Sequence, residues 1–148
     1  MDPRGVAQMT LHSSAIEVVR DAADRLHRYG SVTTELAAGS RDPWGASVAD
    51  LVFTPTVGPS KDLVFLVEYK FSRDSDYLPS ADLASSASLA AGLNFPGVHK
   101  PVHVLSTNAM LGTAAERLAR DYEITCFGGV SSGEELAQQV ATLAGIAR

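Results

Sequence analysis

Residues 48–70, VADLVFTPTVGPSKDLVFLVEYK, decide the fold of this chain. Two apolar runs, 48–53 and 63–67, lie on either side of a segment that contains two prolines and a glycine, and these residues interrupt regular structure. We therefore predict two β-strands joined by a hairpin loop.

Two acids and a lysine are expected to converge at the open end of this hairpin. Pro59 is the midpoint between Asp50 and Glu68, so symmetric pairing of the strands places these two acids opposite each other. Glu68 and Lys70 are two positions apart on one strand and share a face. The neighbouring positions on that face are apolar, and burying charge without compensation is costly. This pattern favours a metal site, and the alternative is an exposed cross-strand ion pair.

The three side chains suit a hard divalent cation. Mg²⁺ binds one or two carboxylates and fills its remaining positions with water, so Asp50 and Glu68 supply the minimum ligand set. The backbone carbonyl of Tyr69 is a further expected ligand, whereas its side chain points to the other face and is expected in the core. Lys70 can orient or deprotonate an attacking water and offset charge on a phosphate. We expect Mg²⁺ as cofactor, with Mn²⁺ able to substitute.

Composition predicts one ordinary globular domain. The chain has 148 residues, 45% of them hydrophobic, and a net charge of −5. No apolar run is long enough to cross a bilayer and no secretion signal is visible, so we expect a cytoplasmic protein without membrane contact. The single cysteine, Cys126, is expected to be a buried strand thiol, and the four histidines lack the spacing of a zinc site. The negative charge argues against a broad basic surface for nucleic acid.

Periodicity predicts the element order α-β-β-β-α-β-α-β-α, a mixed sheet with helices on both faces. We place the single domain at 11–148 and expect residues 1–10 to be loosely ordered. Three sets of residues have capping-box spacing, Ser14 with Glu17, Thr113 with Glu116 and Ser132 with Glu135. The predicted helices are 11–29, 81–93, 113–122 and 132–146, and the predicted strands are 31–36, 48–53, 63–70, 102–106 and 124–127. The small-residue helix 81–93 hints at a homodimer.

Asp50 followed by Glu68-Tyr69-Lys70, after a helix that carries an acid, resembles the PD-(D/E)xK nuclease superfamily. The likeness is greatest to Mrr-type restriction endonucleases and next to archaeal-type Holliday junction resolvases. It spans residues 15–128 and includes the pair Ile16-Glu17 in the first helix. Two departures stand out: Ala49 replaces the usual proline before the aspartate, and residues 82–87 lack the glutamine that many members carry.

The resemblance implies a restriction endonuclease-like fold, an α-β-β-β-α-β core followed here by a further α-β-α. It implies a Mg²⁺-dependent endonuclease that hydrolyses DNA phosphodiester bonds, in restriction or anti-phage defence. Asp50, Glu68, Lys70 and Glu17 are then the catalytic residues, although the Ser14 capping box is a competing role for Glu17. The alternatives are a Holliday junction resolvase or repair nuclease, and an inactive nuclease-fold module that mediates dimerisation or partner binding. A further protein that supplies specificity is an expected partner.

Several further residues, in the first predicted strand and in loops, are weaker candidates. Glu35 is an alternative third acid, and Trp44 is either a base-stacking side chain or a loop anchor. Three basic residues, Arg41, Lys61 and Arg73, are expected in loops that flank the candidate site. Each is either a phosphate contact or simply a solvent-exposed charge.

Overall fold

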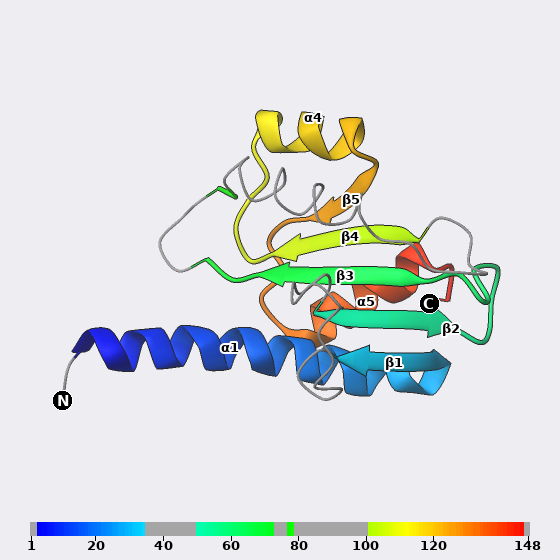
Figure 1. Ribbon diagram of the computed structural model, residues 1–148, viewed down its shortest axis with the longest axis horizontal. Coiled ribbons are helices and arrows are strands. Elements are labelled where there is room, and N and C mark those ends of the chain that lie inside the picture. The colour runs from blue at the N-terminus through cyan, green and yellow to red at the C-terminus, as the bar shows by residue number, and fades with distance from the viewer. Residues whose placement is uncertain (1–2, 35–49, 73–76, 79–100, 147–148) are drawn as a thin grey trace, which may run out of the picture.

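The computed structural model describes residues 3–34, 50–72, 77–78 and 101–146, with side chains described from Ala15 onward. Its centre is a five-stranded mixed sheet in the order β1-β2-β3-β4-β5 (Figure 1). The strands are β1 Gly30–Thr34, β2 Leu51–Pro55, β3 Phe65–Lys70, β4 Val102–Thr107 and β5 Ile124–Phe127. The helices are α1 Pro3–Leu26, the short 3-10 helix η1 His27–Tyr29, α4 Thr113–Asp121 and α5 Gly133–Leu143.

The strand directions follow from the connections. Strands β1, β2 and β3 pair antiparallel, whereas β3, β4 and β5 pair parallel. Parallel neighbours need a crossover, which α4 provides between β4 and β5. The predicted α/β class, a mixed sheet flanked by helices, is confirmed. The predicted helix 81–93 lies outside the described residues.

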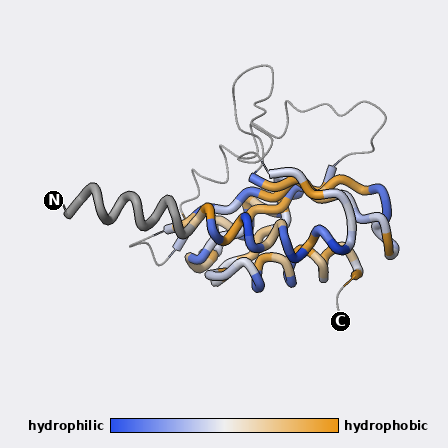
Figure 2. Tube along the Cα trace, turned by 90° about the horizontal axis from the view of Figure 1, so that it is seen from below, coloured by the Kyte–Doolittle hydropathy of each residue, from blue (hydrophilic) through white to orange (hydrophobic). Residues whose placement is uncertain are grey.

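Pleating divides the sheet into two faces with different helical covers. The α1 face packs on α1 and α5, and its sheet residues are Leu51, Phe53, Phe65, Val67, Tyr69 and Val104. The α4 face packs on α4 and carries Leu66, Glu68, Lys70, His103 and Leu105. The coloured part of α1 alternates between hydrophilic and hydrophobic residues (Figure 2). Such alternation is typical of a helix with one buried side.

Helix α1 begins earlier than its sequence predicts. It starts at Pro3 rather than near residue 11, so the segment 1–10 that was expected to be loosely ordered is helical from Pro3. Ser14 is therefore inside the helix, and the predicted capping box with Glu17 is wrong. Interior N–H groups already donate to carbonyls four residues back, so they need no side-chain acceptor.

The helical segment ends at Gly30, as predicted, but the reason for glycine is tertiary. A Cβ atom at Gly30 would collide with the backbone carbonyl of Thr54, because β2 passes directly beside β1 at this point. Strand pairing therefore restricts this position more tightly than the helix end does.

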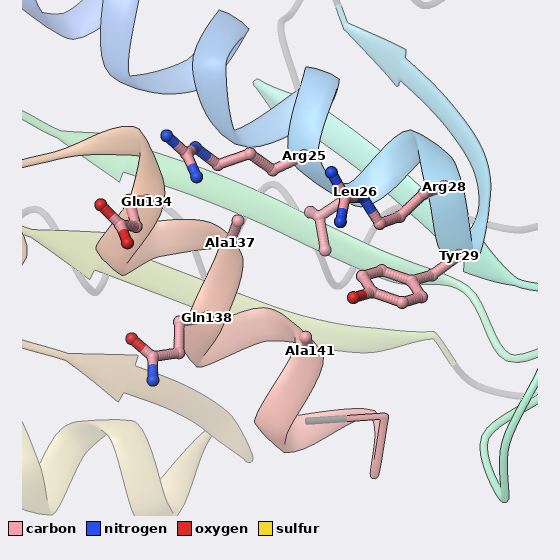
Figure 3. A pocket seen from close by; sticks show the side chains of 8 residues that line it. All are labelled: Arg25, Leu26, Arg28, Tyr29, Glu134, Ala137, Gln138 and Ala141. Carbon is pink, nitrogen blue, oxygen red and sulfur yellow. The ribbon is translucent and has the colours of Figure 1, made fainter. Parts of the chain in front are cut away.

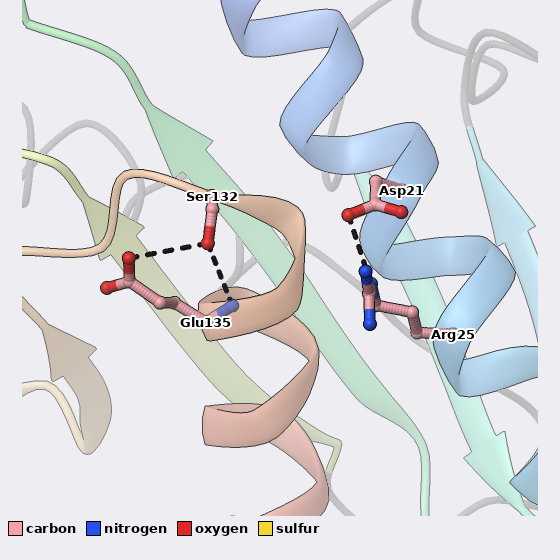
Figure 4. Close-up of polar contacts among 4 residues, drawn as sticks. All are labelled: Asp21, Arg25, Ser132 and Glu135. Atoms are coloured by element: carbon pink, nitrogen blue, oxygen red, sulfur yellow. Dashed lines mark hydrogen bonds and ion pairs between the residues drawn. The ribbon is translucent and has the colours of Figure 1, made fainter.

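The two remaining capping predictions have different outcomes. Ser132 caps α5, since its Oγ accepts a hydrogen bond from the Glu135 backbone N–H at 3.1 Å, and Glu135 Oε1 lies 3.3 Å from that hydroxyl (Figure 4). The start of α4 is confirmed near Thr113, but Gly112 is its N-cap and no side chain caps it. The predicted capping box there is wrong by one position.

Tyr69 connects the sheet to the segment before α5. Its side chain is buried on the α1 face, as predicted, and its hydroxyl donates to the backbone carbonyl of Val130 at 2.6 Å. Burial, reinforced by the negative charge of Glu135, raises the pKa of Tyr69 to about 12. The hydroxyl therefore stays protonated and remains a donor over the whole neutral range.

Tyr69→Phe is expected to lower the free energy of unfolding by about 1–2 kcal/mol, because it leaves the buried Val130 carbonyl without this donor. Urea unfolding followed by circular dichroism measures the change. An unchanged unfolding midpoint would show that the carbonyl is satisfied in another way. Tyr29→Phe is a suitable control, since Tyr29 is only half-buried.

None of the helices in the described part of the chain is both long and apolar enough to span a bilayer.

Candidate functional site

The predicted hairpin register is observed. Strands β2 and β3 pair Leu51 with Val67, Val52 with Leu66 and Phe53 with Phe65, which is symmetric about Pro59. Asp50 lies just outside this ladder, and its N–H donates at 2.9 Å to the carbonyl of Val67, the residue that pairs with Leu51. The regular pairing therefore ends at Leu51, and Asp50 and Glu68 lie directly beyond it, at the open end of the hairpin.

The Asp50 side chain is held against the backbone of β3. Its Oδ2 accepts a hydrogen bond from the Tyr69 N–H at 2.7 Å, a short charge-assisted contact. Asp50 is half-buried directly before β2. This contact therefore fixes its carboxylate at the end of the sheet where β3 terminates. The same carboxylate is therefore both a backbone acceptor and a candidate ligand.

Glu68 and Lys70 meet on the α4 face. Lys70 Nζ lies 3.0 Å from Glu68 Oε1, and the two side chains are 38% and 16% exposed. The ion pair that was the alternative interpretation is thus present, but a pair this exposed contributes only about 0–1 kcal/mol to stability.

Two hydrogen bonds from one side chain, which the sequence did not predict, fix the chain just beyond Lys70. The Asn108 side chain, after β4, accepts from the Ser72 N–H through Oδ1 and donates to the Ser72 carbonyl through Nδ2, each at 2.6 Å. Both backbone groups of Ser72 are thereby satisfied by one amide. The available signal was an asparagine directly after a buried strand, which alone does not identify its partner.

The other two predicted site residues, Tyr69 and Glu17, lie in different places relative to Asp50, Glu68 and Lys70. Tyr69 lies between Glu68 and Lys70, so its backbone carbonyl is at the site although its side chain is not. Glu17 is exposed on α1, which packs against the opposite face of the sheet. In the described ranges no three histidine, cysteine, aspartate or glutamate side chains are grouped closely enough to hold a metal ion, so Glu17 does not complete a three-carboxylate set there.

The expectation that Lys61 flanks the site is wrong. Lys61 lies in the β2–β3 turn, where its N–H donates to Gly58, at the closed end of the hairpin. Asp50 and Glu68 are at the open end, about five residues or 17 Å away along the strands. The other flanking candidates, Glu35, Arg41, Trp44 and Arg73, lie outside the described residues.

Two further titratable side chains lie on the neighbouring strands β4 and β5. His103 is 7% exposed on the α4 face, and neither ring nitrogen has a hydrogen-bond partner among the residues that the structure describes. Burial lowers the pKa of His103 below its ordinary value, and the negative charge of Glu68 partly opposes this. Cys126 lies in β5, and burial raises the pKa of its thiol to about 11, which suits a structural thiol rather than a nucleophile.

His103 is expected to make the protein less stable in mild acid. The unfolded histidine binds a proton near pH 6.5, whereas the folded one resists protonation until lower pH. The unfolded state then binds more protons, so the free energy of unfolding falls as the pH drops below about 6.5. Urea unfolding at several pH values should show this slope in the wild type and a flatter one in His103→Leu. Equal slopes would contradict the assignment.

A cavity of about 350 Å³ lies elsewhere, between the end of α1 and α5 (Figure 3). Arg25 and Arg28 line one wall, and Glu134 and Gln138 line the other. This cavity is on the α1 face near the start of β1, which is the other end of the strands from Asp50. It is separate from the candidate site.

No protein-family model, curated protein or solved structure matches this chain. The assignment of function therefore depends on the arrangement of Asp50, Glu68 and Lys70.

Proposed function

We propose that this protein is a metal-dependent endonuclease of the restriction endonuclease-like fold that hydrolyses DNA phosphodiester bonds. The observation that carries the proposal is that the Asp50 carboxylate meets the Glu68–Lys70 segment: Asp50 Oδ2 accepts from the Tyr69 N–H at 2.7 Å, and Lys70 Nζ lies 3.0 Å from the Glu68 carboxylate. The order of helices and strands is compatible with the core that the resemblance implies.

The donor set fits Mg²⁺, or Mn²⁺ in its place. Two carboxylates and a backbone carbonyl are hard oxygen ligands, and open positions would be filled by water. Asp50, Glu68 and the Tyr69 carbonyl would hold the ion, which when bound neutralises phosphate charge and acidifies water. Lys70 orients the attacking water and stabilises negative charge on the phosphate oxygens. Glu17 has a proposed assisting role that no observed contact supports.

The proposed setting, by resemblance, is restriction or anti-phage defence in the cytoplasm. A homodimer and a further protein that supplies specificity belong to the same proposal. A Holliday junction resolvase or repair nuclease uses the same chemistry on another DNA structure, so the choice of substrate decides between them.

Cleavage assays on the purified chain test the proposal. Plasmid, single-stranded, duplex and four-way-junction DNA are incubated with increasing Mg²⁺ or Mn²⁺, with EDTA as control, and products are resolved on gels. We expect cleavage that requires the cation. Absence of cleavage of every substrate, in both metals, would overturn the proposal.

An inactive nuclease-fold module is the second candidate. The Glu68–Lys70 ion pair and the net charge of −5 favour it, because the first satisfies a ligand without metal and the second weakens contact with phosphates. Calorimetric titration distinguishes the two: a module need not bind metal, whereas the nuclease binds Mg²⁺ or Mn²⁺ and loses that binding in Glu68→Gln.

A further inference from the structure

Two large apolar side chains are exposed side by side near the candidate site. Tyr77 is 57% exposed and Met110 is 61% exposed. A parallel β-bridge joins the two residues, and the Leu78 N–H donates to the Met110 carbonyl at 2.9 Å. Single exposed apolar residues are common, but an adjacent aromatic and methionine on a paired backbone form a small defined surface.

This Tyr77–Met110 surface lies at the end of the sheet where β3 terminates. Lys70 pairs with Thr107, and Met110 follows three residues later. The path from Lys70 across to Thr107, along the chain to Met110 and across the bridge to Tyr77 is two strand spacings and three residues long. The Cα atoms of Lys70 and Tyr77 are therefore at most about 20 Å apart. The short bridge is drawn beyond the ends of β3 and β4 in Figure 1. At about 3.4 Å per nucleotide, the surface is within about six nucleotides of the bond that the site would cleave.

Buried neighbours hold the Tyr77–Met110 surface in place. Leu78, next to Tyr77, is 4% exposed and packs in the cluster under α4 with Leu105 and Ala115. The ring lies close to the N-cap of α4, since a Cβ atom at Gly112 would be in ordinary van der Waals contact with Tyr77 Cδ1, at 3.6 Å. The Tyr77 ring is therefore held beside the start of α4 with more than half of the residue exposed.

We infer that Tyr77, with Met110 beside it, stacks against an unpaired base of the substrate. This inference rests on the proposed nuclease function and specifies its substrate class: DNA with a single-stranded stretch close to the cleaved bond. Aromatic side chains stack on any base, but only an unpaired base offers its face. In a chain of net charge −5, stacking supplies affinity that phosphate contacts provide poorly.

The test measures binding of the full chain to two DNAs in Ca²⁺. One is a fully paired duplex, and the other carries a short single-stranded gap with 2-aminopurine as a fluorescent base. Tyr77→Ala is expected to weaken binding of the gapped DNA about tenfold and to abolish quenching of 2-aminopurine, with less than about twofold change for the duplex. Tyr77→Phe should restore both signals, and Met110→Ala should weaken the gapped complex less than Tyr77→Ala does.

Tyr122→Ala is the matched control, because Tyr122 is 53% exposed at the other end of α4. It should behave as the wild type. If the wild type cleaves DNA but Tyr77→Ala binds gapped DNA as tightly as the wild type, the stacking role is wrong and the nuclease proposal stands. If quenching depends on Tyr77 but no DNA is cleaved in Mg²⁺ or Mn²⁺, stacking stands and the nuclease proposal falls. If no DNA binds, both are wrong.

Discussion

Asp50→Asn, Glu68→Gln and Lys70→Met are each expected to reduce metal-dependent DNA cleavage by about a thousandfold, while the protein stays folded. Each substitution keeps the size of the side chain and removes one charge from a group that acts on the phosphate or its cation. Loss of one such electrostatic contact typically costs two to three orders of magnitude in rate. Initial rates on a labelled oligonucleotide, with protein in excess, measure the effect.

The hydrogen bonds of the site determine the choice of variants. An asparagine at Asp50 retains an oxygen that can accept from the Tyr69 N–H, so the contact at 2.7 Å is kept. Glu68→Gln loses an ion pair that contributes about 0–1 kcal/mol at this exposure. Circular dichroism and the urea midpoint should therefore stay close to those of the wild type.

Glu116→Gln is the matched control, since it removes an exposed carboxylate from the first turn of α4. Its cleavage rate should equal that of the wild type. Cleavage by Asp50→Asn or Glu68→Gln at the wild-type rate would refute the metal ligands, and the same result for Lys70→Met would refute only the role of the lysine.

Gly133→Val is expected to destabilise the protein by about 3 kcal/mol, the largest effect on stability that we predict. Gly133 is buried at the first position of α5, where this helix crosses α1. A Cβ atom there would lie 2.8 Å from the Val18 carbonyl oxygen and 2.5 Å from Asp21 Cβ. The Asp21 carboxylate could rotate away and release Arg25, its partner at 3.0 Å (Figure 4), but Asp21 Cβ and the Val18 carbonyl cannot move without the backbone of α1. Helix α5 must therefore shift away from α1.

Urea unfolding of a short series measures this contact. Gly133→Ala should lie between the wild type and Gly133→Val, because it adds fewer atoms to the same gap. Glu134→Val, at the next and exposed position of the same turn, controls for helix propensity. A Gly133→Val protein as stable as that control would show that the helices can separate without cost.

The hairpin was predictable because its determinants are local. Apolar runs of strand length, broken by prolines and a glycine, restrict both the strands and their register, which leaves Asp50 and Glu68 just beyond the last pair, at the open end of the hairpin. The cap of α5 was predictable for the same reason, since Ser132 and Glu135 are three residues apart. The start of α1 was not, because a capping-box pattern also occurs inside helices and carries no information on where the first turn forms.

Contacts between distant segments explain the remaining differences. Lys61 is close to Glu68 in sequence but lies at the closed end of the hairpin, whereas Asn108 is distant in sequence but bonds Ser72 beside the site. Sequence separation is a poor guide to proximity once strands extend by about 3.3 Å per residue.

The sequence by itself determined the alternation of helices and strands, the pairing of β2 with β3, and the positions of the two acids and the lysine on that hairpin. These features depend on side-chain periodicity and turn residues, which act over a few neighbours. Only the tertiary structure decided that α1 and α5 cover the face opposite Glu68, that Gly133 packs directly against α1, and that Tyr77 meets Met110. These arise from packing between segments brought together by folding, and no local pattern records which surfaces will touch.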